Sequence, residues 1–224
     1  MSKYRRIEVF QAMEKSGLVP VYFHSNIEIC KKVTKAVYDG GLRVFEFVNR
    51  GDFAHHVFSE LNKYALTELP GMIIGAGSIV DAPTTAIYIQ EGANFIVSPL
   101  LNAEMAKICN RRKILWVPGC GSLSEINYAE ELGAEICKIF PAAQVGGPEF
   151  VKNIKGPCPW TSIMPTGGVE PTDDNLKKWF DAGVSCVGMG SQLFNKTDIE
   201  SGNFANITKK TQQVLELINK IRSK

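Results

Sequence analysis

Eight short apolar runs, rich in β-branched and aromatic residues, recur along the chain and limit the folds that it can adopt. An amphipathic stretch with helical periodicity follows each run. Successive runs begin roughly 19 to 29 residues apart, about the length of one strand, one loop and one helix. The runs are "LVPVYF", "RVFEFV", "MIIGAG", "NFIVSP", "KILWVPG", "EICKIF", "SIMPTGG" and "CVGMG". No linker interrupts this alternation, so the pattern predicts a single α/β domain over residues 1–224.

The count of eight strand-helix units favours a (β/α)8 barrel, or TIM barrel, whose active site lies at the C-terminal ends of its strands. An open doubly wound sheet is the alternative. The number of units and the lack of a Gly-x-Gly-x-x-Gly opening both fit that alternative poorly. A helical segment is expected before the first strand. The closing segment "FANITKKTQQVLELINKIRSK" predicts an amphipathic helix that covers the outer face of the barrel or a subunit contact.

Capping signals mark the ends of two of the expected helices. The capping box "SLSE" predicts a helix over residues 122–132, and Gly133 is expected to end it. Pro171 is expected to open the next such helix, with the aspartates at 173–174 in its first turn, where they complement the helix dipole.

Composition excludes several classes of function. The chain is 45% hydrophobic and 21% charged, with a formal net charge of +2 and a pI near 8.2. Its basic residues are spread along the sequence, which predicts no affinity for nucleic acid or an anionic membrane. No apolar stretch has the length of a signal peptide or a membrane span, so we expect a cytoplasmic protein. The six cysteines form no Cys-x-x-Cys pair and are expected to be reduced.

Charged side chains interrupt or follow three of the apolar runs. Glu46 lies inside "RVFEFV", Lys138 inside "EICKIF", and Arg50 just after the second run. A barrel interior is normally filled by branched apolar side chains, and burying an unpaired ammonium group costs several kcal/mol unless it loses its proton. An isolated strand carboxylate is as often structural as functional. A lysine and a glutamate on two strands of one barrel, both near the catalytic face, more often mark a functional site.

Seven motifs in this order resemble the 2-keto-3-deoxy-6-phosphogluconate (KDPG) aldolase family, which includes enzymes acting on 4-hydroxy-2-oxoglutarate (KHG). They are "VFEFVNR", "GAGS", "VSP", "VPGC", "KIFPAA", "PTGGV" and "GMGS". The resemblance extends from about Leu18 to Phe194 and covers seven of the eight strand ends. It implies a (β/α)8 barrel, usually trimeric, and a class I aldolase that needs no metal or other cofactor.

The resemblance implies roles for the three charged residues. Lys138 precedes an apolar residue and "FPA", as the Schiff-base lysine of the family does, and only a neutral amine attacks a ketone. Glu46 matches the general acid/base that moves protons in these steps. Arg50 matches the arginine that holds the pyruvate carboxylate, where its planar fork can donate two charge-assisted hydrogen bonds.

Three more residues are expected beside the keto acid. Ser78 of "GAGS" stands where many family members have threonine, and it keeps the hydroxyl as a carboxylate contact. Pro99 of "VSP" and Thr166 of "PTGG" match further substrate-binding positions.

The glycine-rich ends of the last two runs resemble the phosphate site of the family. Gly167 and Gly168 bring amides without side chains to the rim of the barrel. Ser191 of "GMGS" adds a hydroxyl at what is expected to be the N-terminus of a short helix. No lysine or arginine lies within either motif, so phosphate is expected to bind mainly through backbone amides and hydroxyls.

The sequence departs from the family motifs at two places where the choice of substrate is expected to be decided. Asn49 and Gly51 flank Arg50 where many members have a threonine and an acidic residue after the arginine, and Ala143 stands where some members carry glutamate. The resemblance implies cleavage of KDPG to pyruvate and glyceraldehyde 3-phosphate. The alternatives are KHG aldolase activity, alone or in a bifunctional enzyme, and a non-catalytic barrel that binds a phosphorylated ligand or keto acid.

Other polar residues carry weaker signals. His55 and His56 are adjacent on an expected helix and lack the i, i+4 spacing of a metal clamp, so no metal site is predicted there. His24, after the first strand, is a possible substrate contact, although packing is the more frequent role. Cys120 has no nearby histidine in the sequence to activate it, which favours a packing role.

Overall fold

Strands and helices alternate along residues 2–223, the part of the chain that this computed structural model describes. The strands are β1 (Leu18–Tyr22), β2 (Val44–Val48), β3 (Ile73–Gly77), β4 (Phe95–Val97), β5 (Leu115–Val117), β6 (Gly119–Cys120), β7 (Cys137–Ile139), β8 (Ile163–Pro165) and β9 (Val187–Met189). The helices are α1 (Arg6–Ser16), α2 (Ile27–Asp39), α3 (Ala54–Glu68), α4 (Ala82–Gln90), α5 (Ala103–Arg112), α6 (Leu123–Glu131), α7 (Gly147–Lys155), α8 (Asp173–Asp181), α9 (Lys196–Glu200) and α10 (Phe204–Arg222). Every apolar run of the sequence therefore contains a strand.

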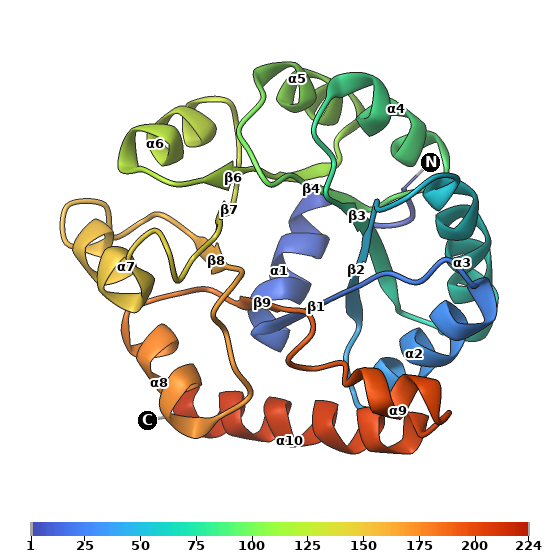
Figure 1. The fold of residues 1–224 in the computed structure, drawn as a ribbon. Helices are drawn as coiled ribbons and strands as arrows, with labels where there is room; N and C mark the ends of the chain where they lie inside the picture. The colour runs from blue at the N-terminus through green and yellow to red at the C-terminus, as the bar shows by residue number, and fades with distance from the viewer. Residues whose placement is uncertain (1, 224) are drawn as a thin grey trace.

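The strands form two parallel sheets instead of the single eight-stranded sheet that the sequence predicts. A curled six-stranded sheet has the order β5-β4-β3-β2-β1-β9, and a three-stranded sheet has the order β6-β7-β8. The fifth run is divided between both sheets at Pro118, because proline has no backbone N–H to donate to a sheet ladder. The other edges of the two sheets also meet: an isolated parallel bridge joins Thr166, just after β8, to Gly188 of β9. The strands surround a common centre, with α1 across it and the other helices outside the strands (Figure 1).

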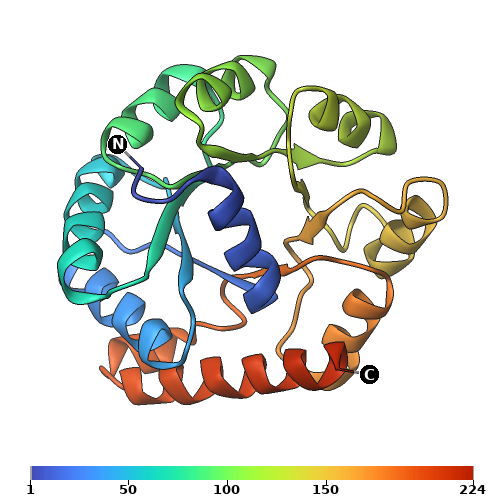
Figure 2. The same ribbon diagram turned by 180° about the vertical axis from the view of Figure 1, so that it is seen from behind.

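Apolar side chains fill the space inside the curled sheets. Alternate residues of the strands, among them Val44 and Leu115, form an interior cluster with Ile136, which precedes β7, and with Val9 and Met13 of α1. The residues between them, such as Phe45, face the surrounding helices in a second cluster. Helix α1 lies across the centre of the strands, as Figure 2 shows from behind. The expected N-terminal helix is therefore present and contributes to the core.

The C-terminal helix α10 packs along the outside of the domain, against α2 and α8. One face of α10 is buried, with the spacing of an amphipathic helix; it comprises Ile207, Thr211, Val214 and Ile218. No helix within residues 2–223 is long and apolar enough to cross a membrane.

The two capping predictions had different outcomes. The Ser122 hydroxyl caps α6 by accepting from the backbone N–H of Glu125 at 3.2 Å, and Gly133 follows the helix in a left-handed conformation, with φ at 88°. At α8 the predicted start was wrong by two residues: the helix begins at Asp173 with Thr172 as its N-cap, and Pro171 lies before the cap. The Thr172 hydroxyl accepts from Asn175, which a proline side chain cannot do.

Candidate active site

The side chains of Glu46 and Lys138 meet inside the domain, although they come from different sheets. Glu46 is the central residue of β2 and Lys138 that of β7, and both are on the interior face: strand alternation puts Glu46 on the face of Val44 and Lys138 on that of Ile136, and both of these belong to the interior cluster. Glu46 Oε1 lies 3.9 Å from Lys138 Nζ, and the two side chains are 1% and 6% exposed. The pairing expected from the sequence is therefore present as a buried ion-pair contact.

The environment of Glu46 favours its protonated form. Burial raises the pKa of the Glu46 carboxyl above its ordinary value, and the positive charges of Lys138 and Arg50 only partly oppose this effect. Glu46 Oε2 is buried and has no hydrogen-bond partner among the described residues. A carboxyl group with a raised pKa and an unpaired oxygen is suited to proton transfer with a bound ligand.

A glycine on the neighbouring strand makes room for the Glu46 side chain. Gly77 on β3 is paired with Val48 in the parallel register, and a Cβ at this position would collide with Glu46 Oε1. The close approach of the carboxyl group to the β3 backbone therefore requires glycine. Gly188 likewise makes room for the Thr166 side chain, because a Cβ at position 188 would collide with the Thr166 hydroxyl oxygen.

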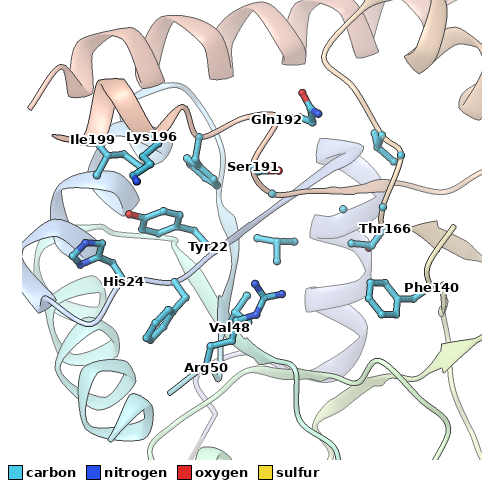
Figure 3. A pocket seen from close by; sticks show the side chains of 18 of the residues that line it. Tyr22, His24, Val48, Arg50, Phe140, Thr166, Ser191, Gln192, Lys196 and Ile199 are labelled. Atoms are coloured by element: carbon cyan, nitrogen blue, oxygen red, sulfur yellow. The ribbon is translucent and has the colours of Figure 1, made fainter. Parts of the chain in front are cut away.

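A cavity of about 590 Å³ opens beside this pair, at the C-terminal ends of the strands (Figure 3). Val48, two residues after Glu46 on the same face, forms part of its wall, as does Phe140, whose ring centroid lies 5.0 Å from Lys138 Nζ. Glu46 and Lys138 do not themselves line the cavity, but each lies two residues before a residue of its wall, Val48 and Phe140 respectively.

Arg50 and Thr166 both line this cavity. Figure 3 shows the Arg50 guanidinium turned toward the centre of the cavity, with Thr166 on the opposite wall. Arg50 forms no ion pair within residues 2–223, and the buried Thr166 hydroxyl has no hydrogen-bond partner there. Both side chains are free to bind a ligand with an anionic or polar group.

The expected phosphate motifs reach the same cavity. Gly167, Gly168 and Ser191 line it, and both glycines have positive φ values, 93° and 83°. The expected helix N-terminus at Ser191 was wrong: Ser191 lies in a turn, and α9 begins at Lys196 with Asn195 as its N-cap. Leu193 and Phe194 donate backbone hydrogen bonds to the Gly190 carbonyl, which forms a single turn at Ser191, and the next helix begins five residues later.

Besides Glu46 and Lys138, two other sequence-predicted site residues do not line this cavity. Ser78 follows β3 with a left-handed backbone, φ 57°, and Pro99 follows β4; both are partly buried. The Pro99 carbonyl lies so close to Gly119 that a Cβ on Gly119 would collide with it. Both residues thus lie at C-terminal ends of strands. Their strands, β3 and β4, are on one side of β2 in the sheet, and β1 and β9, which contribute to the cavity wall, are on the other side.

Sequence reasoning missed several residues of the cavity wall. Tyr22 and Phe23 line it from the end of β1, a position that the strand prediction could have identified. Lys196 lines it from α9, where it lies 3.5 Å from Glu200, and no motif marks it in the sequence. Lys196 brings a cation to a wall that was expected to bind phosphate mainly through backbone amides and hydroxyls.

The histidines occupy different environments. His24 lines the cavity, and its Nδ1 accepts a hydrogen bond from the backbone N–H of Asn26, 3.0 Å away, so Nε2 carries the proton of the neutral ring. His55 and His56 are in contact on α3, with ring centroids 4.2 Å apart and ring planes tilted by 59°. Within residues 2–223, no three potential ligand side chains of the His, Cys, Asp or Glu type gather to hold a metal ion. Cys120 is buried.

Comparison with known proteins gives a consistent result. The family model described as KDPG and KHG aldolase matches residues 9–210. The chain is 32% identical to a 2-dehydro-3-deoxy-phosphogluconate aldolase of Pseudoalteromonas atlantica, over 96% of this chain and 97% of the relative. It is 30% identical to the KHG/KDPG aldolase of Escherichia coli K12, over 89% of this chain and 91% of the relative.

A solved structure agrees with these relatives. The KDPG aldolase of Legionella pneumophila, captured with pyruvate as a covalent carbinolamine intermediate, superposes with a TM-score of 0.82 at 28% identity, over 92% of this chain and 97% of that one. The family match spans most of the chain, and the relatives match it nearly end to end. The chain is a member of the KDPG and KHG aldolase family, a family of lyases.

Proposed function

We propose that this protein is a class I aldolase that cleaves KDPG to pyruvate and D-glyceraldehyde 3-phosphate. The observation that carries the proposal is the buried contact between Lys138 Nζ and Glu46 Oε1, 3.9 Å apart, next to a cavity of about 590 Å³. Membership of the family and the names of the relatives agree with this reaction. The reaction requires an amine nucleophile and a proton carrier in contact, and these two side chains provide both.

Residues 1–224 are proposed to form one domain with the architecture of a (β/α)8 barrel. Two links between the sheets support this architecture. Only Pro118 separates β5 of the larger sheet from β6 of the smaller one, and the Thr166–Gly188 bridge joins β8 to β9. The two sheets are then arcs of one ring, with β5 and β6 as a single interrupted strand.

In the proposed reaction, Lys138 is the Schiff-base residue. Glu46 takes a proton from the Lys138 ammonium group, and the raised pKa of the Glu46 carboxyl lowers the cost of that transfer. The neutral amine adds to the C2 keto carbon, Glu46 protonates the resulting hydroxyl, and water leaves to give the iminium. This cation accepts the electron pair of the C3–C4 bond in the cleavage step.

Glu46 is proposed to carry the remaining protons. As a carboxylate it removes the proton of the C4 hydroxyl, so that the C3–C4 bond breaks, the aldehyde leaves and an enamine remains on Lys138. Protonation of the enamine at C3 and addition of water to the iminium then release pyruvate and free Lys138. The buried Glu46 Oε2, which has no partner within residues 2–223, supports the assignment of a proton carrier.

The substrate's two anionic ends are proposed to bind at separate parts of the site. Arg50 holds the carboxylate, supported by its place in the cavity wall and its lack of an ion-pair partner among the described residues. Thr166, Ser78 and Pro99 complete the surroundings of the keto acid. The proposal for Ser78 and Pro99 rests on the family resemblance, since neither lines the cavity.

Gly167, Gly168 and Ser191 are proposed to bind the phosphate group. Their place in one wall of the cavity supports this assignment, because amides without side chains can approach an anion closely. Lys196 of the same wall supplies an ammonium group that can donate to the phosphate, although Glu200, 3.5 Å from it, also lines the cavity and offsets its charge.

KHG is the second candidate substrate, for the chain alone or in a bifunctional enzyme. The observation in its favour is the 30% identity to a relative named KHG/KDPG aldolase. A non-catalytic barrel is the more distant alternative, and the contact between Lys138 and Glu46 argues against it, because ligand binding alone does not require a buried lysine beside a buried carboxyl group.

The proposed setting of the protein follows from the proposed reaction. We propose a homotrimer in the cytoplasm that serves the Entner-Doudoroff route of carbohydrate metabolism and needs no metal or other cofactor. Exposed apolar side chains, including Val80 and Ile87, each 47% exposed, and Leu100 at 41%, supply surface for a subunit contact.

Steady-state measurement of pyruvate release tests the proposed function. KDPG is expected to give the highest kcat/KM in a panel of phosphorylated and non-phosphorylated 4-hydroxy-2-keto acids, with activity unchanged by excess chelator. A preference for KHG would promote the second candidate. Binding without pyruvate release from any member of the panel would leave only the non-catalytic barrel.

A further inference from the structure

A second cavity, of about 350 Å³, lies near the N-terminus and is lined by five cations. They come from two segments far apart in sequence: Lys3 and Arg5 precede or begin α1, and residues 111–113, "RRK", end α5. All five side chains belong to exposed residues. Sequence reasoning found basic residues spread along the chain, whereas the fold brings these two groups together.

The position of this cavity separates it from the candidate active site. Ile114, which lines it, directly precedes β5, and Asn94, which holds the neighbouring N-terminal segment, directly precedes β4. The cavity is therefore at the N-terminal ends of the strands. Arg50, Thr166 and Ser191 follow strands and lie at the opposite ends.

The N-terminal segment is fixed in place by a buried amide. Asn94 is 3% exposed, and its Oδ1 accepts hydrogen bonds from the Ser2 hydroxyl at 2.9 Å, the Lys3 backbone N–H at 3.1 Å and the Tyr4 backbone N–H at 3.4 Å. The Asn94 amide nitrogen donates to the Ile74 carbonyl at 3.0 Å. These bonds hold Lys3 beside the end of α5 instead of leaving the segment free to move away from like charges.

The positive charge of the cluster is mostly unneutralised. Among the ion pairs of the described residues, only Arg5 of the five cations has a partner, Glu8 at 3.0 Å. The dipole of α5 favours cations in its last turn. That effect does not account for Lys3 and Arg5, which belong to another segment. Fixed like charges around one cavity repel each other, and a bound anion removes this cost.

The floor of the cavity is apolar. The accessible part of this floor is Tyr4, a partly buried residue whose ring centroid lies 5.7 Å from Lys3 Nζ, while Ile89 and Ile114 of the lining are almost fully buried. Cations around an apolar floor fit a ligand with a charged end and an organic body. We propose that this cavity binds a small organic anion with two or three linked phosphates, a ligand of the nucleoside di- or triphosphate class, at a site distinct from the active site.

The choice of a small ligand over nucleic acid rests on the extent of the charge. The cations surround one cavity and do not continue as a stripe, and the formal net charge of the chain is only +2. A nucleic-acid surface normally has a basic face long enough to follow several phosphates.

Calorimetric titration of the full-length protein with tripolyphosphate and with ATP, in low salt and without divalent cations, tests the proposal. Saturable binding of both probes is expected, with ATP the tighter because its base and sugar contact the apolar floor. Arg111→Ala/Arg112→Ala is expected to weaken both by about tenfold or more, since each guanidinium removed takes a charge-assisted hydrogen bond with it. Lys3→Ala/Arg5→Ala, from the other segment, is expected to do the same.

Two controls distinguish binding in this cavity from general attraction to positive charge and from binding at the active site. Lys209→Ala/Lys210→Ala removes the same charge from adjacent residues of α10, outside the cavity, and should leave binding unchanged. Ser191→Asp, at the candidate active site, should also leave it unchanged, and both cavity variants should release pyruvate at the wild-type rate. The proposal is wrong if neither probe binds, if the α10 pair weakens binding equally, if Ser191→Asp abolishes it, or if ATP binds more weakly than tripolyphosphate.

Discussion

Lys138 Nζ lies 3.9 Å from Glu46 Oε1 in the interior of the domain, although β7 and β2 belong to different sheets. A buried ion pair contributes little net stability, because desolvation of the two charges offsets their attraction. The rest of the interior is apolar, and the chain also keeps a glycine at position 77 to accommodate the carboxyl group. The pair is therefore better explained by chemistry than by stability.

Replacing Glu46 with glutamine tests its role as proton carrier. Glu46→Gln keeps the shape of the side chain and removes proton transfer, so kcat for KDPG cleavage is expected to fall by about a hundred- to ten-thousand-fold. Pyruvate binding, measured by titration, should change much less, because Arg50 and Thr166 remain in the cavity wall. Turnover close to the wild-type rate would assign the proton transfers to another group.

The same variant tests the protonation state of Glu46 through the pH dependence of stability. Since burial raises the pKa of Glu46 in the folded state, both states are protonated well below the ordinary carboxyl pKa of about 4.3. As the pH rises through that value, the unfolded chain loses the proton and the folded chain keeps it, so stability falls until the pH passes the folded-state pKa.

Wild type is thus expected to lose stability relative to Glu46→Gln as the pH rises above about 4.3, by at most about 1.4 kcal/mol for each pH unit. Urea unfolding of both proteins at several pH values between 4 and 8 measures the difference. A difference in free energy of unfolding that stays constant, or that changes in the other direction, would contradict the raised pKa.

Gly77→Ala tests the close packing of Glu46 against β3. The added Cβ would collide with Glu46 Oε1 and displace the carboxyl group from Lys138, so we expect kcat to fall by at least about tenfold, as for a misplaced catalytic group. Gly156→Ala is the matched control, because the nearest atom to its new Cβ is 3.6 Å away. Wild-type kcat in Gly77→Ala would mean that the position of Glu46 does not depend on this glycine.

Ser191→Asp tests the phosphate site. A carboxylate in this wall should repel the phosphate of KDPG and raise its KM, while cleavage of KHG, which has no phosphate, should be almost unchanged. Ser201→Asp adds the same charge just after α9, outside the cavity, and should affect neither substrate. If Ser191→Asp impairs both substrates equally, or neither, the phosphate assignment is lost.

The sequence was most informative where one local rule decides the structure. Each of the apolar runs contains a strand, and period-two alternation put Glu46 on the same face as Val44 and Lys138 on the same face as Ile136; that this face is the interior one is shown by the structure. The Ser122 cap of α6 follows from its capping box. These features depend on residues that are close together in the chain.

Features that depend on contacts between distant segments were missed. The division of the fifth strand at Pro118 results from pairing with two different neighbours, and periodicity does not reveal it. Lys196 lines the cavity because a turn at Ser191 precedes α9, so that the helix begins only at residue 196. Lys3 lines the same cavity as Arg111 because Asn94 binds the backbone of the N-terminal segment. No local pattern encodes these placements.

Borohydride reduction in the presence of pyruvate tests the central claim most directly. If Lys138 forms the iminium, reduction should leave one stable pyruvate adduct per chain, and peptide mapping should place it on Lys138. Lys155, a partly buried lysine at the end of α7 and outside the cavity, is an internal control that should remain unmodified. An adduct on a different lysine, or none on a protein that still releases pyruvate, would contradict the proposed role of Lys138.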